Sequence, residues 1–339
     1  MSAQGVRISG TVERVAGART VALGGVWVVL HRISRTGAGP HDSVPADGAG
    51  AYRFTVPRDT GVQFVVAARY AGVAYVSEPI EPGAGPARVE PLVVYDTTSR
   101  DPVLVLQRQV LVQGALPDGS RPVVELIVLR NPGSRTVVGP DSASPTWETR
   151  LAAGAMDVVV SQGDLGHEAA HAHGDVLEVL APLPPGEREV VVTYLLPASR
   201  VFRLPVDQAV ADLGLMVADT TATAATLESL GITSFEGTRY LRLQGRDVAP
   251  LSEVVVRLSA APVRAEDFWW LVVLAAAATL VGTLAWWRRH DARARDPESQ
   301  AAQIAVQDGA RVEDPEWPGR RRRLVATLAA TLANRADAP

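Results

Sequence analysis

The stretch that decides the architecture is residues 268–287, FWWLVVLAAAATLVGTLAWW, which contains no charged residue and no proline. A helix of ~20 residues rises ~1.5 Å per residue and reaches ~30 Å, the thickness of the hydrocarbon core of a bilayer. Four of the seven tryptophans of the chain occupy its two ends, where indole rings favour the lipid headgroups. The stretch predicts one transmembrane helix; the alternative is a buried core helix of a soluble domain.

The charges on either side of this stretch predict its orientation. Arg288 and Arg289 follow it at once and two more arginines come soon after, whereas Glu266 and Asp267 precede it. Basic flanks stay in the cytoplasm, so we expect residues 1–267 outside the cell and residues 288–339 as a short cytoplasmic tail. The first ten residues, MSAQGVRISG, have neither a basic nor an apolar region, so we expect an export signal encoded upstream. The alternative is reversed topology.

The composition excludes several classes of function. The 339 residues carry a formal net charge of −4, which does not favour binding to nucleic acid. There is no cysteine, so disulfides, thiolate zinc sites and cysteine nucleophiles are excluded. Hydrophobic residues make up 47% of the chain, which is enough to build packed cores.

The region before the apolar stretch has the pattern of a mainly-β protein. Residues 6–15, 25–33 and 63–70 are rich in valine, isoleucine and aromatic residues, and glycine-rich turns separate them. Only residues 206–213 and 220–230 are candidates for short helices. We therefore predict two β-sandwich units, residues 5–95 and 96–263, ahead of the transmembrane helix.

Three motifs in the first unit carry a resemblance to a known family. They are Gly10-Thr11-Val12, then GVWVVL at residues 25–30, then DGAGAYRF at residues 47–54. Together they resemble the carboxypeptidase regulatory-like domain, a transthyretin-like β-sandwich. The physics agrees, because Asp47 and two glycines suit a turn, and Tyr52 and Phe54 alternate onto one face of the next strand. The resemblance implies an accessory domain without catalytic residues, whose relatives bind sugars or act as spacers.

The second unit also reads as strands and turns. Its run PPGEREVVVTYLLP, at residues 184–197, lies in a β-rich region that leads into the apolar stretch. This layout resembles bacterial envelope proteins of unassigned function, and it implies no named activity.

One motif could carry chemistry. His167-Glu168-Ala169-Ala170-His171 has the spacing of a zinc peptidase, in which one helix presents both histidines to zinc and the glutamate activates water. Glycines on both sides and strand-like sequence before and after favour a solvated hairpin loop instead. We therefore predict no catalytic residue, no cofactor and no dedicated metal site. The weaker alternative is incidental metal binding by His167, His171 and His173.

Two tryptophans outside the apolar stretch are candidates for stacking on sugars. They are Trp27 and Trp147, and a tryptophan in such a protein more often belongs to the core. We expect both to be core residues.

The cytoplasmic tail ends in a basic amphipathic segment. Four consecutive arginines at residues 320–323 precede Leu324, Leu328 and Leu332, which share one helical face. This pattern suits an anionic membrane surface or a partner helix, and the alternative is a frayed basic end.

Taken together, these patterns predict a single-pass envelope protein of a bacterial cell membrane that binds or scaffolds without catalysis. Its expected partners are the lipid bilayer and other envelope proteins or a carbohydrate, and not nucleic acid. The alternatives are a carbohydrate-binding surface module, an accessory subunit of a membrane complex that uses the tail as its contact and, with least support, the zinc peptidase.

Overall fold

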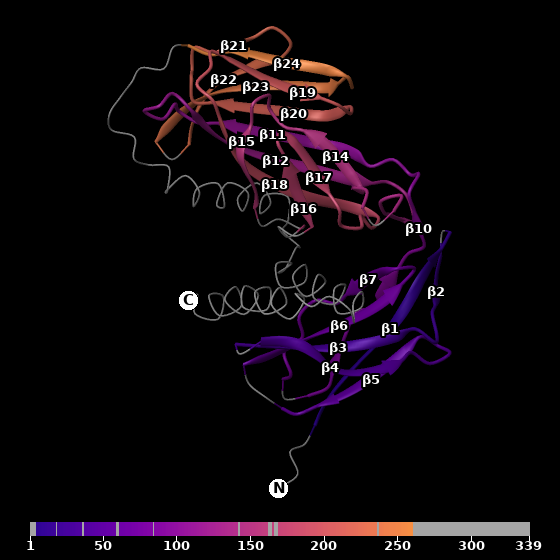
Figure 1. Ribbon diagram of the computed structural model, residues 1–339. Helices are drawn as coiled ribbons and strands as arrows, with labels where there is room; N and C mark the ends of the chain where they lie inside the picture. Colours follow the sequence, from indigo (N-terminus) through magenta and orange to yellow (C-terminus); the bar gives the residue numbers. More distant parts are fainter. Residues whose placement is uncertain are drawn as a thin grey trace. The chain divides into compact units, whose positions relative to one another are not determined.

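The computed structural model describes residues 5–259, apart from residues 18, 36, 59–60, 84, 142, 162–164, 166–168 and 236. Every helix or strand assigned within these residues is a strand, so the predicted mainly-β class is confirmed (Figure 1). The described residues contain no helix long and apolar enough to cross a bilayer. The predicted transmembrane helix at residues 268–287 and the tail at residues 288–339 lie outside the described residues.

The prediction of two short helices is wrong. Residues 206–213 run from the last residue of β19 (Val201–Val206) into β20 (Val210–Val217), and residues 220–230 include β21 (Thr223–Ala224) and the start of β22 (Glu228–Phe235). Val206, Val210 and Leu213 have the four- and three-residue spacing of a helix face, which explains the expectation. From Leu213 onward, however, every second residue is buried, and that two-residue period is the period of a strand.

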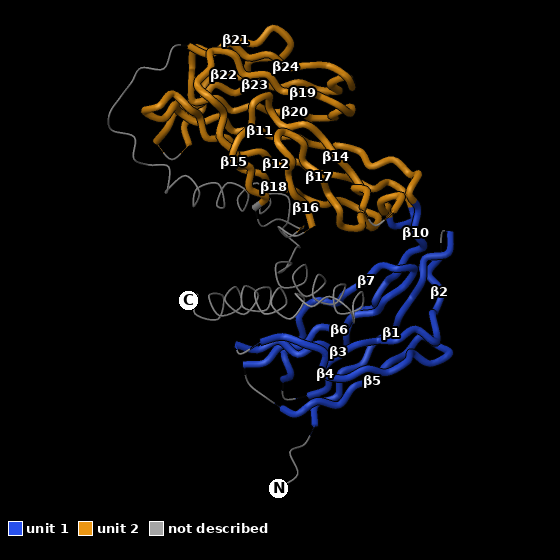
Figure 2. The backbone as a smooth tube through the Cα atoms, viewed as in Figure 1, with its two compact units in different colours: residues 1–98, 134–136, 293–339 blue, residues 99–133, 137–292 orange. Residues whose placement is uncertain are grey.

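The described residues divide into two compact units (Figure 2). Unit 1 comprises residues up to 98 together with residues 134–136. Unit 2 comprises residues 99–133 and those from 137 onward.

Unit 1 contains two main sheets. In the first, β1 lies between β2 and β5, and β8 and β9 run parallel to β1; the second has the order β4-β3-β6-β7. A further short strand, β10, pairs with β13. The bounds are β1 (Val6–Ala16), β2 (Arg19–Ala22), β3 (Trp27–Ser34), β4 (Gly37–Pro45), β5 (Ala51–Val56), β6 (Val62–Tyr70), β7 (Val73–Val76), β8 (Ala87–Arg88), β9 (Leu92–Val94), β10 (Thr97–Thr98) and β13 (Thr136–Val137).

The turn before β5 is built as its sequence predicts. The Oδ1 atom of Asp47 accepts hydrogen bonds from the backbone N–H groups of Ala49 and Ala51, each at 2.9 Å. Gly50 follows with φ of 75°, a left-handed conformation that favours glycine. Tyr52 and Phe54 are then both buried on one face of β5, which confirms the predicted alternation.

Gly10 and Tyr52 explain why the first motif begins with glycine. The two residues are paired across β1 and β5. A Cβ atom at Gly10 would lie 2.3 Å from the hydroxyl oxygen of Tyr52, so the tyrosine ring occupies the space that a side chain would need. A large aromatic ring packed over a cross-strand glycine stabilises strand pairing and fixes its register.

Unit 2 is built around a seven-stranded sheet of order β15-β18-β12-β11-β20-β23-β22. Its pairs are antiparallel except for β11 and β20, which are parallel. Two three-stranded sheets, β14-β17-β16 and β19-β24-β21, complete the unit. The remaining bounds are β11 (Leu104–Val112), β12 (Arg121–Asn131), β14 (Trp147–Arg150), β15 (Met156–Ser161), β16 (Ala170–His173), β17 (Val176–Val179), β18 (Gly186–Leu196), β19 (Val201–Val206), β21 (Thr223–Ala224), β23 (Thr238–Val248) and β24 (Ser252–Arg257).

One hydrophobic core joins the three sheets of unit 2. It includes Ile127 and Val192 from the large sheet, Leu177 from β17, and Leu204 and Val256 from β19 and β24. Because alternate residues of a strand point to opposite faces, each sheet buries one face in this core and turns the other away from it. The packing is therefore sandwich-like.

Candidate functional site

An arginine is buried inside the core of unit 2, beside a carboxylate that is buried as well. Arg108, on β11, is 2% exposed and its Nε donates to Oε1 of Glu125 at 2.5 Å. Its two terminal nitrogens donate to backbone carbonyl oxygens of Pro205, at 2.9 Å, and Arg150, at 2.8 Å. One guanidinium thus connects the seven-stranded sheet to β19 and β14, which belong to the other two sheets.

Tyr194 completes this network from the neighbouring strand β18. Its hydroxyl donates to Oε2 of Glu125 at 2.8 Å, so both carboxylate oxygens have a partner. Burial, together with the nearby Glu125 carboxylate, raises the pKa of Tyr194 well above its ordinary value, and the phenol stays a neutral donor. Arg108, Glu125 and Tyr194 are all hydrogen-bonded within this network, which is the arrangement expected of groups that stabilise the fold.

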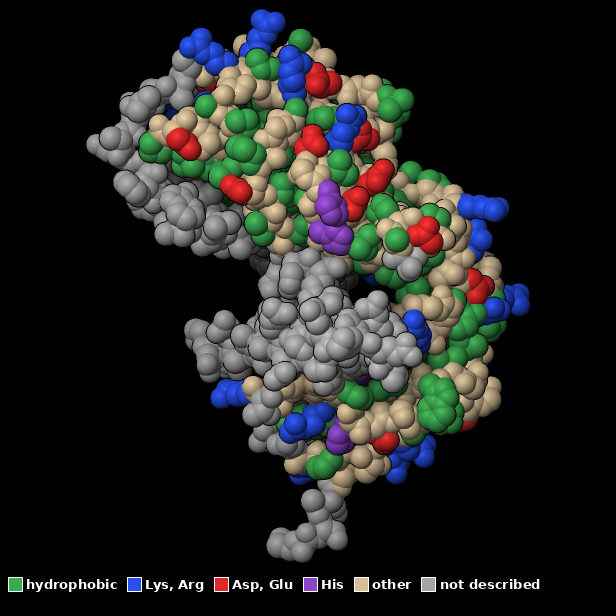
Figure 3. Space-filling model, in the orientation of Figure 1, with side chains coloured by type: hydrophobic (Ala, Val, Ile, Leu, Met, Phe, Trp, Pro, Cys, Tyr) green, Lys and Arg blue, Asp and Glu red, His purple; other side chains and the backbone are tan. Residues whose placement is uncertain are grey.

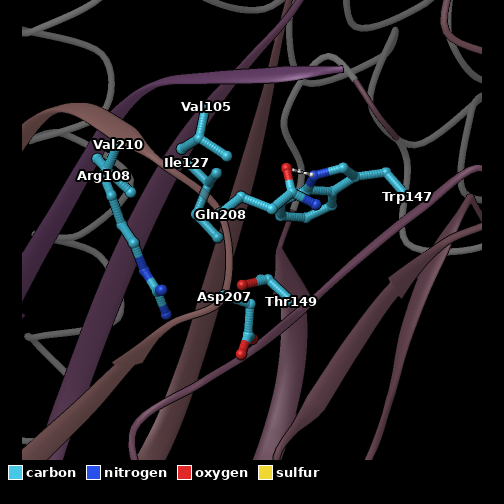
Figure 4. Close-up of a pocket in the computed structure, with 8 residues that line it drawn as sticks. All are labelled: Val105, Arg108, Ile127, Trp147, Thr149, Asp207, Gln208 and Val210. Carbon is cyan, nitrogen blue, oxygen red and sulfur yellow. Dashed lines mark hydrogen bonds between the residues drawn. The ribbon is translucent and has the colours of Figure 1, made fainter. Parts of the chain in front are cut away.

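A small cavity lies beside Arg108. Figure 4 shows the side chains around it, among them Trp147 and Gln208 joined by a hydrogen bond of 3.1 Å from the indole Nε1 to Oε1. Its volume of about 10 Å³ has room for about one water molecule. It is far smaller than pockets that hold organic ligands, which measure ~300–1,000 Å³. The residues that line it are Val105, Arg108, Ile127, Trp147, Thr149, Asp207, Gln208 and Val210.

A second ion pair, between Arg150 and Asp207, lies beside the cavity. Arg150 donates from Nε to Oδ1 of Asp207 at 2.9 Å, and its backbone N–H donates to Oδ2 at 2.8 Å. Burial raises the pKa of Asp207, but the hydrogen bonds from Arg150 outweigh it and leave that pKa below its ordinary value. The carboxylate is therefore held in its charged form by a bidentate contact.

The two candidate tryptophans have opposite environments. Trp147 is 5% exposed and belongs to the core of unit 2, so the expectation for it is confirmed. Trp27 is 62% exposed at the start of β3, so the expectation that it is a core residue is wrong. It is the first residue of its strand and pairs with Pro45 of β4, and its indole extends into solvent.

The peptidase-like motif is not a helix where the structure describes it. His167 and Glu168 lie outside the described residues. Ala170 and His171 belong to strand β16, whereas a zinc peptidase needs both histidines on one helix. The expectation of a solvated loop is also wrong for this part, because Ala169 and Ala170 are buried in the core of unit 2.

The same strand brings two of the three candidate histidines together. The rings of His171 and His173 have centroids 5.7 Å apart at an angle of 84°. Nδ1 of His173 lies 3.2 Å from Oε2 of Glu178 on β17. No group of three or more histidine, aspartate or glutamate side chains within the described ranges is gathered as metal ligands. The arrangement is a pair of imidazoles with an adjacent carboxylate.

Sequence reasoning missed the Arg108 network, although a signal for it exists. Arg108 stands in LVLQRQVLV, where apolar residues lie at both ends of the polar centre, and Glu125 is the one charge in the apolar run VVELIV. Two charges of opposite sign in such surroundings indicate a buried pair, because an unpaired charge cannot be accommodated there. The partners Pro205 and Arg150 offer only backbone carbonyls, which no residue pattern identifies.

Comparisons with known proteins do not assign a family. No protein-family model matches the sequence, and no curated protein matches it. An M1 zinc metallopeptidase from Deinococcus radiodurans is similar with a TM-score of 0.32 and 12% identity, over 49% of this chain and 44% of the peptidase chain. A mutant of that peptidase bound to a Tyr-Ser-Ala substrate has a TM-score of 0.32 and 11% identity, over 46% of this chain and 42% of the mutant chain. The similarity spans less than half of either chain, and at this TM-score it assigns neither a fold nor an activity.

Proposed function

We propose that this chain is a membrane-anchored extracytoplasmic protein that acts by binding or scaffolding, without catalysis. The observation that carries the proposal is the apolar stretch at residues 268–287, with tryptophans at both ends and arginines after it. The polar groups at the centre of unit 2 support the second half of the proposal. Arg108, Glu125 and Tyr194 engage one another, and the cavity beside them has room for about one water molecule.

The connection to the membrane is short. Strand β24 ends at Arg257, and the ten residues 258–267 precede the apolar stretch. A fully extended chain covers at most ~3.6 Å per residue, so this segment reaches at most ~36 Å. Unit 2 is therefore held near the bilayer surface, where it would meet other envelope proteins.

Topology tests the anchoring. A reporter that is active only in the cytoplasm, fused after Pro339, should be active, and protease added outside the cell should digest residues 1–267 but spare the tail. The matched control carries the reporter inserted after Ser259 with the apolar stretch and the tail retained, and it should be inactive. Protection of residues 1–267 together with an active fusion after Ser259 would refute the proposed orientation.

For unit 1 we propose the carboxypeptidase regulatory-like assignment, with a role as spacer or binding module. The turn at Asp47, the buried pair Tyr52 and Phe54, and the packing of Tyr52 over Gly10 support it. These are the residues of the motifs on which the resemblance rests. For the tail we propose contact with the membrane surface or with a partner subunit, since four arginines precede its leucine stripe.

A carbohydrate-binding role is the second candidate, and the exposure of Trp27 favours it. Large aromatic side chains are usually buried, and an indole that is 62% exposed offers a flat apolar face to a sugar ring. Trp27→Ala should abolish binding on a glycan array while the unfolding midpoint is unchanged. Leu251→Ala, at an apolar residue that is 87% exposed in unit 2, is the control and should keep the signal. Equal binding by both variants, or none by the unmodified protein, would exclude this role.

A further inference from the structure

The outward face of the sheet β14-β17-β16 presents an ordered row of acidic and imidazole side chains. In the register, Glu148 lies opposite Glu178, and Glu178 lies opposite His171. The residues on either side of this row, such as Trp147 and Leu177, are buried, so the row points away from the core. Figure 3 shows histidine side chains gathered beside acidic ones on the surface of unit 2.

His171 and His173 are spaced for chelation. Residues two apart on a strand point to the same face and lie ~6.6–6.8 Å apart along it. Their ring centroids are 5.7 Å apart. A metal ion bound at ~2.0–2.1 Å by two imidazole nitrogens needs those nitrogens ~3.3 Å apart, so the rings of exposed His173 and half-buried His171 would turn toward each other on binding.

Glu178 orients the imidazole of His173 for metal binding. Its Oε2 lies 3.2 Å from Nδ1 of His173, a distance at which Nδ1–H donates to the carboxylate. That hydrogen bond favours the tautomer that carries its lone pair on Nε2. Ligating histidines in metalloproteins usually have such a carboxylate on their other nitrogen, because it orients the ring and strengthens it as a ligand.

The carboxylates supply an independent reason for a cation here. Glu148 and Glu178 face each other directly across two strands, an arrangement that is destabilising for like charges. The nearby arginine on the same face, Arg150, is engaged by Asp207. A divalent cation held by the imidazoles next to Glu178 relieves this repulsion, so local charge and ligand geometry favour the same occupant.

We propose that His171 and His173 form a surface site for a first-row divalent transition-metal ion, with Glu178 as the orienting carboxylate and solvent as the remaining ligands. Two imidazoles with open positions suit Cu²⁺, Ni²⁺ and Zn²⁺, and Cu²⁺ binds tightest in the usual order of affinity. The site does not depend on the membrane anchoring, and it shares only His171 with the peptidase-like motif, on a strand and not on a helix.

Titration of the purified full chain with CuCl₂ tests the site. Calorimetry should show that one Cu²⁺ ion binds tightly per chain. The electron paramagnetic resonance spectrum of the bound Cu²⁺ should show coupling to two imidazole nitrogens. His171→Asn and His173→Asn should each lower the affinity at least ~10-fold and leave one coupled nitrogen, and Glu178→Gln should lower it less. None of the three side chains is buried in the core, so the thermal unfolding midpoint should change little.

The matched control is His41→Asn, at an exposed histidine on strand β4 of unit 1. This variant should bind Cu²⁺ as the unmodified chain does. Absence of binding by the unmodified chain would overturn the proposal. So would binding that the double variant His171→Asn/His173→Asn retains at full affinity, since the ion would then lie elsewhere.

Discussion

At the scale of single residues, Arg108 shows how unit 2 tolerates a charge in its core. A buried cation is costly unless its donors are paired, and here the donors of one guanidinium are divided among a carboxylate and two backbone carbonyls. The three partners, Glu125, Pro205 and Arg150, belong to three different sheets. The residue therefore connects the three sheets through one buried side chain.

Removing this arginine should destabilise unit 2 strongly. Arg108→Met leaves the Glu125 carboxylate buried at 0% exposure without its cation, and breaking a buried pair in this way typically costs ~3–5 kcal/mol. Urea unfolding followed by tryptophan fluorescence measures the loss. Arg130→Met, an exposed arginine on the same strand as Glu125, is the matched control and should change stability by less than ~0.5 kcal/mol.

Replacing the whole network tests whether the charge is the cause. The triple variant Arg108→Met/Glu125→Leu/Tyr194→Phe removes both charges and the phenol, and it should regain much of the stability lost by the single variant. A triple variant as unstable as Arg108→Met would show instead that packing volume, and not an unpaired carboxylate, limits this core.

At the scale of elements, the pairing of β1 with β5 depends on a residue without a side chain. Gly10→Ala would place a methyl group 2.3 Å from the Tyr52 hydroxyl oxygen and force the ring or the strand to move. Overpacking of this kind typically costs ~1–3 kcal/mol. The thermal unfolding midpoint should fall accordingly. Gly48→Ala, in the turn before β5, meets no atom within 4 Å and should leave the midpoint nearly unchanged.

The elements also show which sequence signals were sufficient. The turn at Asp47 and the alternation of Tyr52 with Phe54 were predictable, because both depend on neighbouring residues only. The expected helix at residues 206–213 failed because three apolar residues matched a helical spacing over a short window. Trp27 stands in the apolar run GVWVVL and is exposed, whereas Trp147 stands in the polar run SPTWETR and is buried, so tertiary packing decides against the local pattern.

The same limit applies to the candidate site. The sequence places His171 and His173 two residues apart, but a loop, a helix and a strand orient such a pair differently. Glu178 becomes their neighbour only through the hairpin register of β16 and β17. The sequence therefore predicted two of the candidate metal ligands, and the carboxylate beside them needed the pairing of strands.

At the scale of the whole molecule, several aspartates make the fold sensitive to acid. In Asp207 and Asp219, burial raises the pKa but hydrogen bonds outweigh it, so each pKa lies below its ordinary value. Hydrogen bonds to Ser120 and to Ala143 and Ser144 lower the pKa of Asp118 and Asp141 in the same direction. Folded carboxyls therefore bind protons less readily than unfolded ones.

These groups stabilise the fold above pH ~4, the range in which the unfolded aspartates are already ionised, and the stabilisation is lost as the pH falls through their folded-state values. The free energy of unfolding, from urea titrations between pH ~3 and ~7, should therefore fall at the acid end. Asp207→Asn should be less stable at neutral pH and should show a smaller fall. A parallel curve for this variant would mean that Asp207 does not contribute to the acid response.

The single parallel pair in the large sheet of unit 2 has a consequence for how the chain acquires its structure. The strands on one side of that pair come from residues 104–196, and those on the other side from residues 210–248. Val105 therefore meets its partner Val210 only after the intervening chain has been synthesised. Until then β11 is an open edge, able to pair with another nascent chain. Folding of unit 2 should be slow and should depend on protection of that edge while the chain emerges.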